Sequence, residues 1–203
     1  MQRARSQEDK EIKKQEIKDK SIILFLDNPR ELPSVSQIAQ SCGLTKGALY
    51  RYFNTKEEIF LDILQDEYIS WFRLNEKIIN EEREFITILD KIFEPIFKNE
   101  LMLRLSIIAP QIIEINSSLE RTVAFKVFLG ESLDMLTNLV SKKFNISKEI
   151  LLKNLMESFT IFIGAYQMSL LPHNELRKRV PYAFLFPDFE RHTKSLLKKV
   201  WQF

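Results

Sequence analysis

The chain has 203 residues, of which 45% are hydrophobic and 29% are charged, and its formal net charge is +2. These proportions are typical of a folded globular protein and exclude a disordered chain. One cysteine and two histidines exclude an internal disulfide and a structural zinc site, so we expect neither a metal nor another cofactor. The small numbers of Gly (4) and Pro (7) favour an all-α fold.

Two segments of the sequence bear on where the protein works. Residues 1–20 are charged throughout and lack the apolar core of a signal peptide. Residues 159–171 form the most apolar stretch, but it contains Gln167 and is shorter than the roughly 20 residues of a membrane span. We therefore expect a cytoplasmic protein without a membrane partner.

Apolar residues recur at three- and four-residue spacing along the first 80 residues, which predicts helices. Ser34 and Thr45 can each cap a short helix, and Gly43 between them can adopt the left-handed conformation that ends the first one. Thr55 with Glu58 forms a capping box that opens a long helix. The expected helices lie at residues 7–26, 35–41, 46–53 and 56–80.

The rest of the chain predicts further helices and one loop. Pro95 and Pro110 should kink or break the helices that contain them, because proline removes a backbone donor and clashes with the preceding turn. Residues 172–187 are expected to form a loop. The expected helices lie at residues 83–98, 101–115, 118–144, 148–171 and 188–202, which brings the total to about nine.

The two short helices around Gly43 have the features of a helix-turn-helix. This motif needs a glycine in its turn, a small residue where the helices cross, and buried apolar residues on both helices. Gly43 and Ala39 supply the first two. The apolar residues are Ile38, Leu44, Leu49 and Phe53. Because any helical hairpin shares this spacing, the argument for DNA depends on the outward side chains.

The outward face of the second short helix carries side chains suited to DNA. Its N-terminal end is the end of a recognition helix that enters the major groove. The basic excess of the chain is also N-terminal, because residues 1–56 carry a net charge of +4 and residues 57–203 carry −2. We expect DNA contacts from Thr45, Lys46, Gly47, Tyr50, Arg51, Tyr52 and Lys56.

The stretch SVSQIAQSCGLTKGALYRYFNTKEEIF resembles the signature of TetR-family (tetracycline-repressor-like) transcription regulators. It departs from that signature at Cys42, where the family more often has alanine, and we interpret this residue as a small buried hydrophobe. The resemblance implies a helix-turn-helix domain at residues 1–55 and a larger helical-bundle domain for effector binding and dimerisation at residues 56–203, connected by helix 56–80. It places Thr45, Lys46 and Gly47 over base edges, Tyr50, Tyr52 and Lys56 on phosphates, and Leu49 and Phe53 in the core.

The helix expected at 148–171 is apolar on nearly all sides, so it must be covered on all sides. In the TetR plan that the resemblance implies, one face would meet the other helices of the larger domain, and the other face would meet the same helix of a second copy, together with the last helix of the chain. A monomeric core is the alternative. The expected dimer residues are Leu152, Leu155, Phe162, Ile163, Leu196, Leu197 and Trp201.

Aromatic and methionine side chains on the helices of the larger domain, residues 56–203, can converge on one region of its interior. Such stripes form an ordinary core more often than a pocket. Where a cavity exists, this lining suits a small apolar or aromatic effector. The candidate ligand residues are Met102, Ser106, Phe125, Phe128, Met156, Phe159 and Tyr166.

The sequence contains no nucleophile elbow, phosphate loop, metal helix or dinucleotide fingerprint, so we do not expect an enzyme. The favoured function is a DNA-binding transcriptional regulator. We expect a repressor that binds a near-palindromic operator in double-stranded DNA as a homodimer and is released by a small apolar ligand. The alternative is a helical protein-interaction adaptor of the same fold without a ligand response.

Overall fold

The computed structural model describes residues 7–29, 31–170 and 175–202, and all the regular structure within them is helical. This confirms the all-α prediction. None of the helices in these ranges is long and apolar enough to cross a membrane. The α-helices are α1 (Gln7–Asp27), α2 (Val35–Ser41), α3 (Lys46–Leu49), α4 (Lys56–Glu81), α5 (Phe85–Lys98), α6 (Glu100–Ile108), α7 (Glu114–Asn116), α8 (Leu119–Phe144), α9 (Lys148–Ser169), α10 (Leu176–Arg179) and α11 (Phe189–Trp201). A π-helical segment, η1 (Ala109–Ile113), separates α6 from α7, and a 3-10 turn, η2 (Ala183–Leu185), precedes α11.

The differences from the expected helices lie at helix ends and prolines. Pro110 lies in η1, where the expected helix 101–115 is interrupted as predicted. Of the kink or break predicted at Pro95, there is no break: this residue lies in the last turn of α5, which continues past it to Lys98. The expected loop 172–187 contains α10 and η2, while residues 172–174 lie outside the described residues.

The described chain forms two compact units. The first unit consists of the residues up to Ile69 together with Arg104–Phe128, and the second consists of Ser70–Leu103 together with the residues from Leu129 onward. The helices α4 and α8 each begin in the first unit and end in the second. The domain boundary expected between residues 55 and 56 falls within the first unit.

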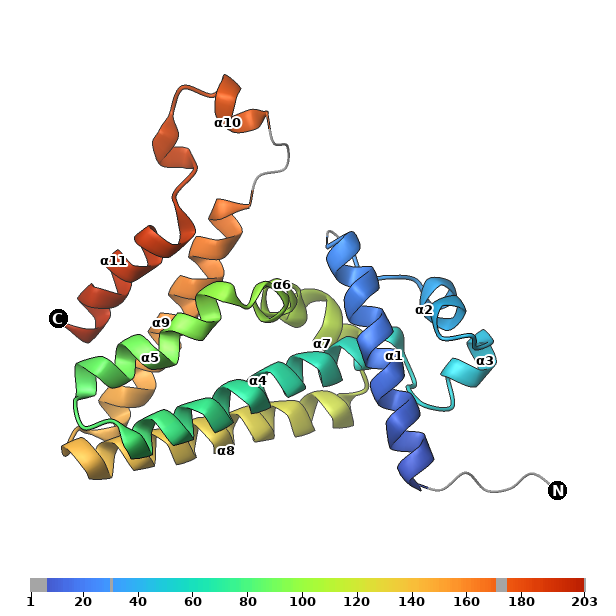
Figure 1. The fold of residues 1–203 in the computed structure, drawn as a ribbon, viewed down its shortest axis with the longest axis horizontal. Coiled ribbons are helices and arrows are strands. Elements are labelled where there is room, and N and C mark those ends of the chain that lie inside the picture. Colours follow the sequence, from blue (N-terminus) through green and yellow to red (C-terminus); the bar gives the residue numbers. More distant parts are fainter. Residues whose placement is uncertain (1–6, 30, 171–174, 203) are drawn as a thin grey trace. The chain divides into compact units, whose positions relative to one another are not determined.

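In the first unit, α1 packs against α2, and α2 packs against α3 (Figure 1). The core where α1 meets the start of α4 contains Phe25 and Phe60, whose ring centroids are 5.7 Å apart. Further along α4, Tyr68 shares a 3.1 Å hydrogen bond with Ser106 of α6 and packs against Phe125 of α8. Residues from both stretches of sequence thus form one core.

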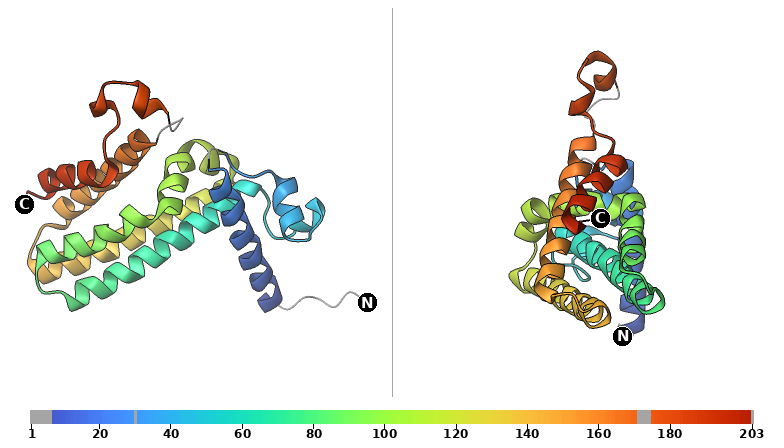
Figure 2. Two further views of the ribbon diagram at one scale, coloured as in Figure 1. Left: turned by 45° about the horizontal axis from the view of Figure 1, so that its top comes forward. Right: turned by 90° about the vertical axis from the view of Figure 1, so that its left-hand side faces the viewer.

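In the second unit, α9 and α11 lie side by side (Figure 2). Phe162 of α9 is 1% exposed, and its ring centroid lies 5.6 Å from that of Phe93, 5.0 Å from that of Phe97 and 6.3 Å from that of Phe189. Burying a phenylalanine side chain contributes roughly 1.5–3 kcal/mol. This aromatic cluster therefore holds α5, α9 and α11 together.

Candidate nucleic-acid interface

The turn between α2 and α3 is fixed by hydrogen bonds of its own backbone. Ser34 caps α2 in a capping box with Gln37, as its position predicts. Gly43 has φ +62°, a conformation that costs glycine little, and the N–H of Leu44 donates to the carbonyl of Ala39 at 2.8 Å. Cys42 is buried, as expected for a small hydrophobe. These contacts hold α3 at a fixed angle to α2.

The helix α3 is shorter than the expected helix 46–53. Thr45 caps it as predicted, because its hydroxyl oxygen accepts from the N–H of Ala48 at 3.1 Å. After Leu49 the backbone continues in tighter turns, in which the N–H of Tyr52 donates to the carbonyl of Leu49. Leu49 and Phe53 are buried, as predicted, so α3 has one face in the core.

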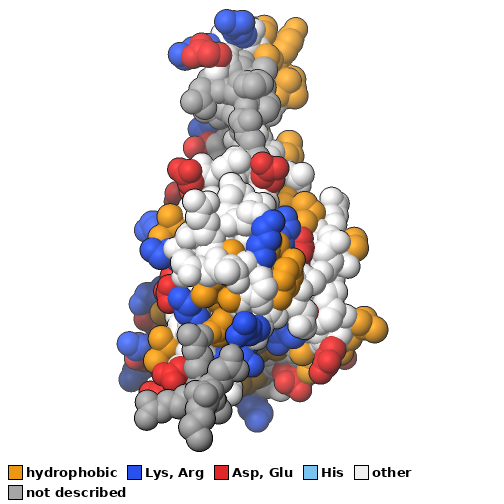
Figure 3. Space-filling view, turned by 90° about the vertical axis from the view of Figure 1, so that its right-hand side faces the viewer, with side chains coloured by type: hydrophobic (Ala, Val, Ile, Leu, Met, Phe, Trp, Pro, Cys, Tyr) orange, Lys and Arg blue, Asp and Glu red, His pale blue; other side chains and the backbone are white. Residues whose placement is uncertain are grey.

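The opposite face of α3 is open to solvent. Thr45, Lys46, Gly47, Tyr50 and Arg51 are all exposed. On this side of the chain, Lys and Arg side chains lie on the central part of the surface beside uncharged atoms (Figure 3). The three residues predicted to contact phosphates differ in exposure: Tyr50 is exposed, whereas Tyr52 and Lys56 are half-buried. The Lys56 ammonium lies 3.9 Å from the Glu57 carboxylate.

The surroundings of Gly47 do not explain why this residue is glycine. A Cβ atom built at this position meets nothing within 4 Å. Glycine inside a helix costs about 1 kcal/mol relative to alanine. Because the packing of the chain itself leaves room for a Cβ, the missing side chain suits the close approach of an outside surface.

Glu58 connects the exit of the helix-turn-helix to α8, a role that its sequence position does not reveal. The carboxylate accepts from the N–H of Asn54 at 3.1 Å, and from the N–H and the hydroxyl of Ser118 at 3.3 and 2.8 Å. Its own N–H donates to the hydroxyl oxygen of Thr55, which is one half of the predicted capping box; for the other half the carboxylate accepts from Asn54 where the pattern predicts Thr55. Ser118 lies 60 residues away in the sequence, and no local pattern marks it as a partner.

The hydrogen bonds of Glu58 decide its charge state. Burial raises the pKa of this carboxyl, but the donors from Ser118 and Asn54 outweigh burial and bring the pKa below its ordinary value of 4.5. Glu58 is only 4% exposed. The side chain is therefore a buried carboxylate at neutral pH. One helical turn further on, Asp62 forms an ion pair with Arg121 of α8.

The residues predicted to bind a ligand are divided between the two units. Ser106 and Phe125 contact Tyr68 in the first unit, and Phe128 is half-buried there. Met102 is buried in the second unit, whereas Met156 is 54% exposed. In the same unit, Phe159 lies edge-on to Trp71, and Tyr166 lies edge-on to Phe189.

The residues predicted for the dimer interface fall into two groups that differ in how far they are buried within the chain. Leu155, Phe162 and Leu197 are buried by the chain's own packing, which leaves little of their surface for a second copy. The others are half-buried: Leu152, Ile163, Leu196 and Trp201.

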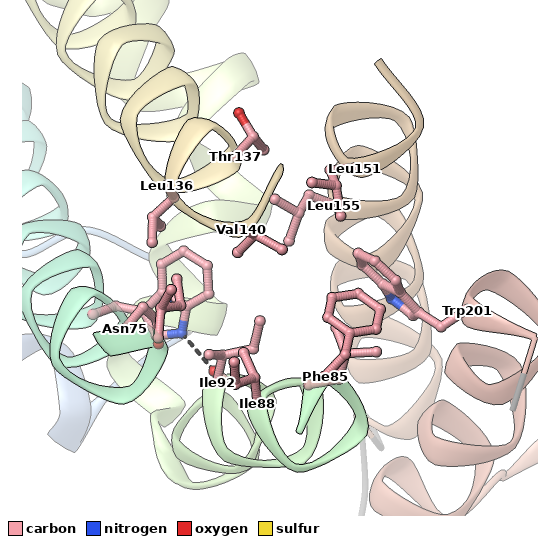
Figure 4. A pocket seen from close by; sticks show the side chains of 13 residues that line it. Asn75, Phe85, Ile88, Ile92, Leu136, Thr137, Val140, Leu151, Leu155 and Trp201 are labelled. Atoms are coloured by element: carbon pink, nitrogen blue, oxygen red, sulfur yellow. Dashed lines mark hydrogen bonds between the residues drawn. The ribbon is translucent and has the colours of Figure 1, made fainter. Parts of the chain in front are cut away.

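An apolar cavity of about 20 Å³ lies in the second unit, between α4, α5, α8, α9 and the end of α11 (Figure 4). Asn75 of α4 lines it and is fully buried. Among the described residues, nothing hydrogen-bonds to either polar atom of the Asn75 side chain. A buried polar group without a partner costs roughly 1–3 kcal/mol. The described residues contain no cluster of His, Cys, Asp and Glu that could hold a metal ion.

A capped helix-turn-helix with an open second helix, followed by a larger set of helices, defines a DNA-binding transcription regulator. Residues 24–63 match the family model of the bacterial regulatory proteins of the tetR family. Residues 65–202 match the model of the tetracyclin repressor-like C-terminal domain. The chain belongs to the TetR family of transcriptional regulators.

Two solved structures are similar to this chain. The fatty acid degradation regulator FadR from Bacillus halodurans has a TM-score of 0.58 at 19% identity, with 94% of this chain and 93% of that chain covered. A putative TetR-family regulator from Mesorhizobium loti has a TM-score of 0.49 at 18% identity, with coverage of 95% and 96%. The first similarity shows a shared fold. No curated protein matches the sequence.

Proposed function

We propose that this regulator is a repressor that binds a near-palindromic operator as a homodimer and leaves it when a small apolar ligand binds the second unit. The observation that carries the DNA part is the open surface of α3. Thr45 and Lys46 are exposed there beside Gly47, whose missing side chain the chain's own packing does not require. Side chains at this end of a recognition helix contact base edges in the major groove.

A homodimer is proposed because one α3 reads only half of such a site. Two symmetry-related recognition helices reach successive major grooves when they lie about one helical turn of DNA apart, roughly 34–36 Å. The outward face of α9 is suited to the contact between copies. Met156 and Met168 are 54% and 57% exposed, and Gly164 between them has open space where a Cβ would lie. Residues spaced by four lie on one face of a helix.

Release of the operator by a ligand is proposed because two helices, α4 and α8, each extend from the Glu58–Ser118 contact to the cavity. Glu58 lies at the start of α4 and Asn75 lies further along the same helix. Ser118 precedes α8, and Leu136 of α8 lines the cavity. A ligand that separates these helices would act on the Glu58–Ser118 contact and so on the exit of the helix-turn-helix. Coupling of this kind typically changes affinity by about 5- to 150-fold.

The DNA part is tested by fluorescence anisotropy with the intergenic DNA beside the protein's own gene. We expect specific binding that competitor DNA of unrelated sequence does not displace. Lys46→Ala should relax the base preference, whereas Tyr50→Phe should weaken binding to all sequences alike. A protein that binds no intergenic DNA at low salt would instead favour the protein-interaction adaptor.

The dimer is tested by sedimentation velocity at micromolar concentration. The double variant Met156→Glu with Met168→Glu should shift the protein to monomer and abolish operator binding. The control is Ile86→Glu on α5, because Ile86 is 52% exposed and lies outside the proposed face. A wild-type protein that sediments only as a monomer refutes the homodimer.

Release is tested with a screen of fatty acids, acyl thioesters and aromatic drugs against the operator complex. The first two classes are included because a protein of similar fold is a fatty acid degradation regulator. An effector should release the DNA and itself bind more weakly when operator is present, because coupling is reciprocal. A compound that binds tightly and leaves operator affinity unchanged is not an effector.

A further inference from the structure

We propose that the cavity around Asn75 binds an uncharged ligand with an apolar body and a planar amide head that pairs with the Asn75 side chain. This assignment rests on the proposed function, because it names the chemical class of the effector. Asn75 is 0% exposed, and its Oδ1 and Nδ2 atoms have no hydrogen-bond partner among the described residues. An amide head offers one donor and one acceptor side by side, which is the complement of an asparagine side chain.

The other polar groups around the cavity are already satisfied. The indole N–H of Trp71 donates to the carbonyl of Ile92 at 2.8 Å (Figure 4). The indole N–H of Trp201 donates to the hydroxyl of Ser158 at 2.9 Å. The hydroxyl of Thr137 donates within α8 to the carbonyl of Leu133 at 2.8 Å. Among the residues that line the cavity, Asn75 is therefore the one whose side-chain polar atoms have no hydrogen-bond partner in the described part of the chain.

The cavity lining also selects against a charged ligand. No Lys, Arg, Asp or Glu side chain is among the residues that line the cavity. An ion placed there would lose its hydration without gaining a counter-ion, so an uncharged head is favoured over a carboxylate or an ammonium group.

The size of the cavity decides how the ligand enters. A volume of about 20 Å³ accommodates roughly one water molecule. A larger ligand must therefore displace lining side chains, and Phe85 and Trp201 are the half-buried ones. Their ring centroids are 5.8 Å apart. Binding thus moves the end of α11 against the start of α5.

The test compares three molecules of the same shape: hexanamide, heptan-2-one and hexanoate. They differ only in whether the head carries NH₂, CH₃ or O⁻. Binding to the full chain is followed by tryptophan fluorescence, because both tryptophans of the sequence, Trp71 and Trp201, line the cavity. We expect hexanamide to bind about tenfold more tightly than either analogue, since a site built around a hydrogen bond rejects ligands that cannot make it.

Two variants test whether Asn75 causes the preference for hexanamide. Asn75→Leu should bind hexanamide and heptan-2-one alike and should unfold at a higher temperature than wild type, because it removes an unpaired buried amide. Thr137→Val, the matched control, should keep the preference, since the Thr137 hydroxyl bonds within its own helix. If Asn75→Leu does not fold, Asn75→Ala replaces it, and the same loss of preference is expected.

The proposal is overturned if wild type binds none of the three molecules, binds them equally, or keeps its preference in the Asn75 variant. If hexanamide binds with the expected preference but leaves operator affinity unchanged, the amide site stands and the ligand-release part of the proposed function fails.

Discussion

The surface of α3 and the cavity around Asn75 depart from ordinary packing in opposite ways. On α3, the chain omits a side chain at Gly47 where it has room for one. At Asn75, the chain buries a polar side chain and gives it no partner among the described residues. Both features cost stability, by about 1 kcal/mol for a helical glycine and roughly 1–3 kcal/mol for an unpaired polar group.

This difference indicates which kind of partner each region is suited to bind. An open surface with a missing side chain suits a large, rigid partner that needs close approach, and DNA is such a partner. A small apolar cavity with one unpaired amide suits a small molecule that brings a single polar head. Variants that restore ordinary packing in one region should therefore leave the binding affinity of the other region unchanged when it is measured with one partner at a time.

The largest expected effect concerns the interior of the second unit. Phe162→Ala should lower the free energy of unfolding by about 3–5 kcal/mol, because it leaves a cavity among the rings of Phe93, Phe97 and Phe189. Urea denaturation measures this loss. Phe184→Ala is the control, since Phe184 is 77% exposed. Equal stability of the two variants would mean that the Phe162 ring is not part of a core.

The next effect separates folding from DNA binding on α3. Gly47→Leu should weaken operator binding about hundredfold, because the new side chain holds α3 away from base edges whose recognition is typically worth about 1–3 kcal/mol per base pair. The melting temperature should not fall, since a Cβ at position 47 meets nothing within 4 Å and the rest of the leucine side chain extends from the exposed surface of α3. Gly130→Leu on α8 is the control, because Gly130 has equal open space. A variant Gly47→Leu that binds operator normally would remove α3 from the interface.

A smaller effect is expected from the buried carboxylate that joins the helix-turn-helix to α8. Glu58→Gln should lower the unfolding free energy at pH 7 by about 1–3 kcal/mol, because charge-assisted hydrogen bonds from Ser118 and Asn54 are weakened. The exposed Glu76 on α4 supplies the control variant Glu76→Gln.

The effect of Glu58 should also depend on pH. Because the pKa of Glu58 in the folded protein lies below its ordinary value of 4.5, the carboxylate stabilises the fold above that pH. The contribution is lost as the pH falls through the folded pKa, so the stability gap between wild type and Glu58→Gln should close in acid. A gap that stays constant from pH 7 to pH 3 would contradict this role.

The smallest effect concerns Lys56, a cation at the edge of the predicted DNA interface. The logarithm of operator affinity falls linearly with the logarithm of the salt concentration. Lys56→Ala should make this slope shallower by about one unit for each phosphate that the ammonium group no longer neutralises. Lys77→Ala on the same helix is the control, because Lys77 pairs with Glu81 and lies outside the predicted interface. An unchanged slope would show that Lys56 does not bind phosphate.

The sequence by itself determined the features that depend on near neighbours in the chain. Ser34 and Thr45 cap their helices, and Gly43 adopts positive φ, because a cap or a turn is completed within three or four residues. Leu49 and Phe53 are buried for a similar reason, since helical and turn spacing places them on one side. These local rules were enough to indicate the helix-turn-helix and its exposed face.

Only the tertiary structure decided the contacts that join distant parts of the chain. The capping-box pattern predicted Glu58 beside Thr55, but its bond to Ser118 spans 60 residues and leaves no periodic signal. The apolar pattern of α9 likewise could not tell which faces the chain itself covers, so Phe162 lies within an aromatic core while Met156 is exposed. Asn75 was not predicted, because its lack of a partner depends on how α4, α5, α8, α9 and α11 pack around it.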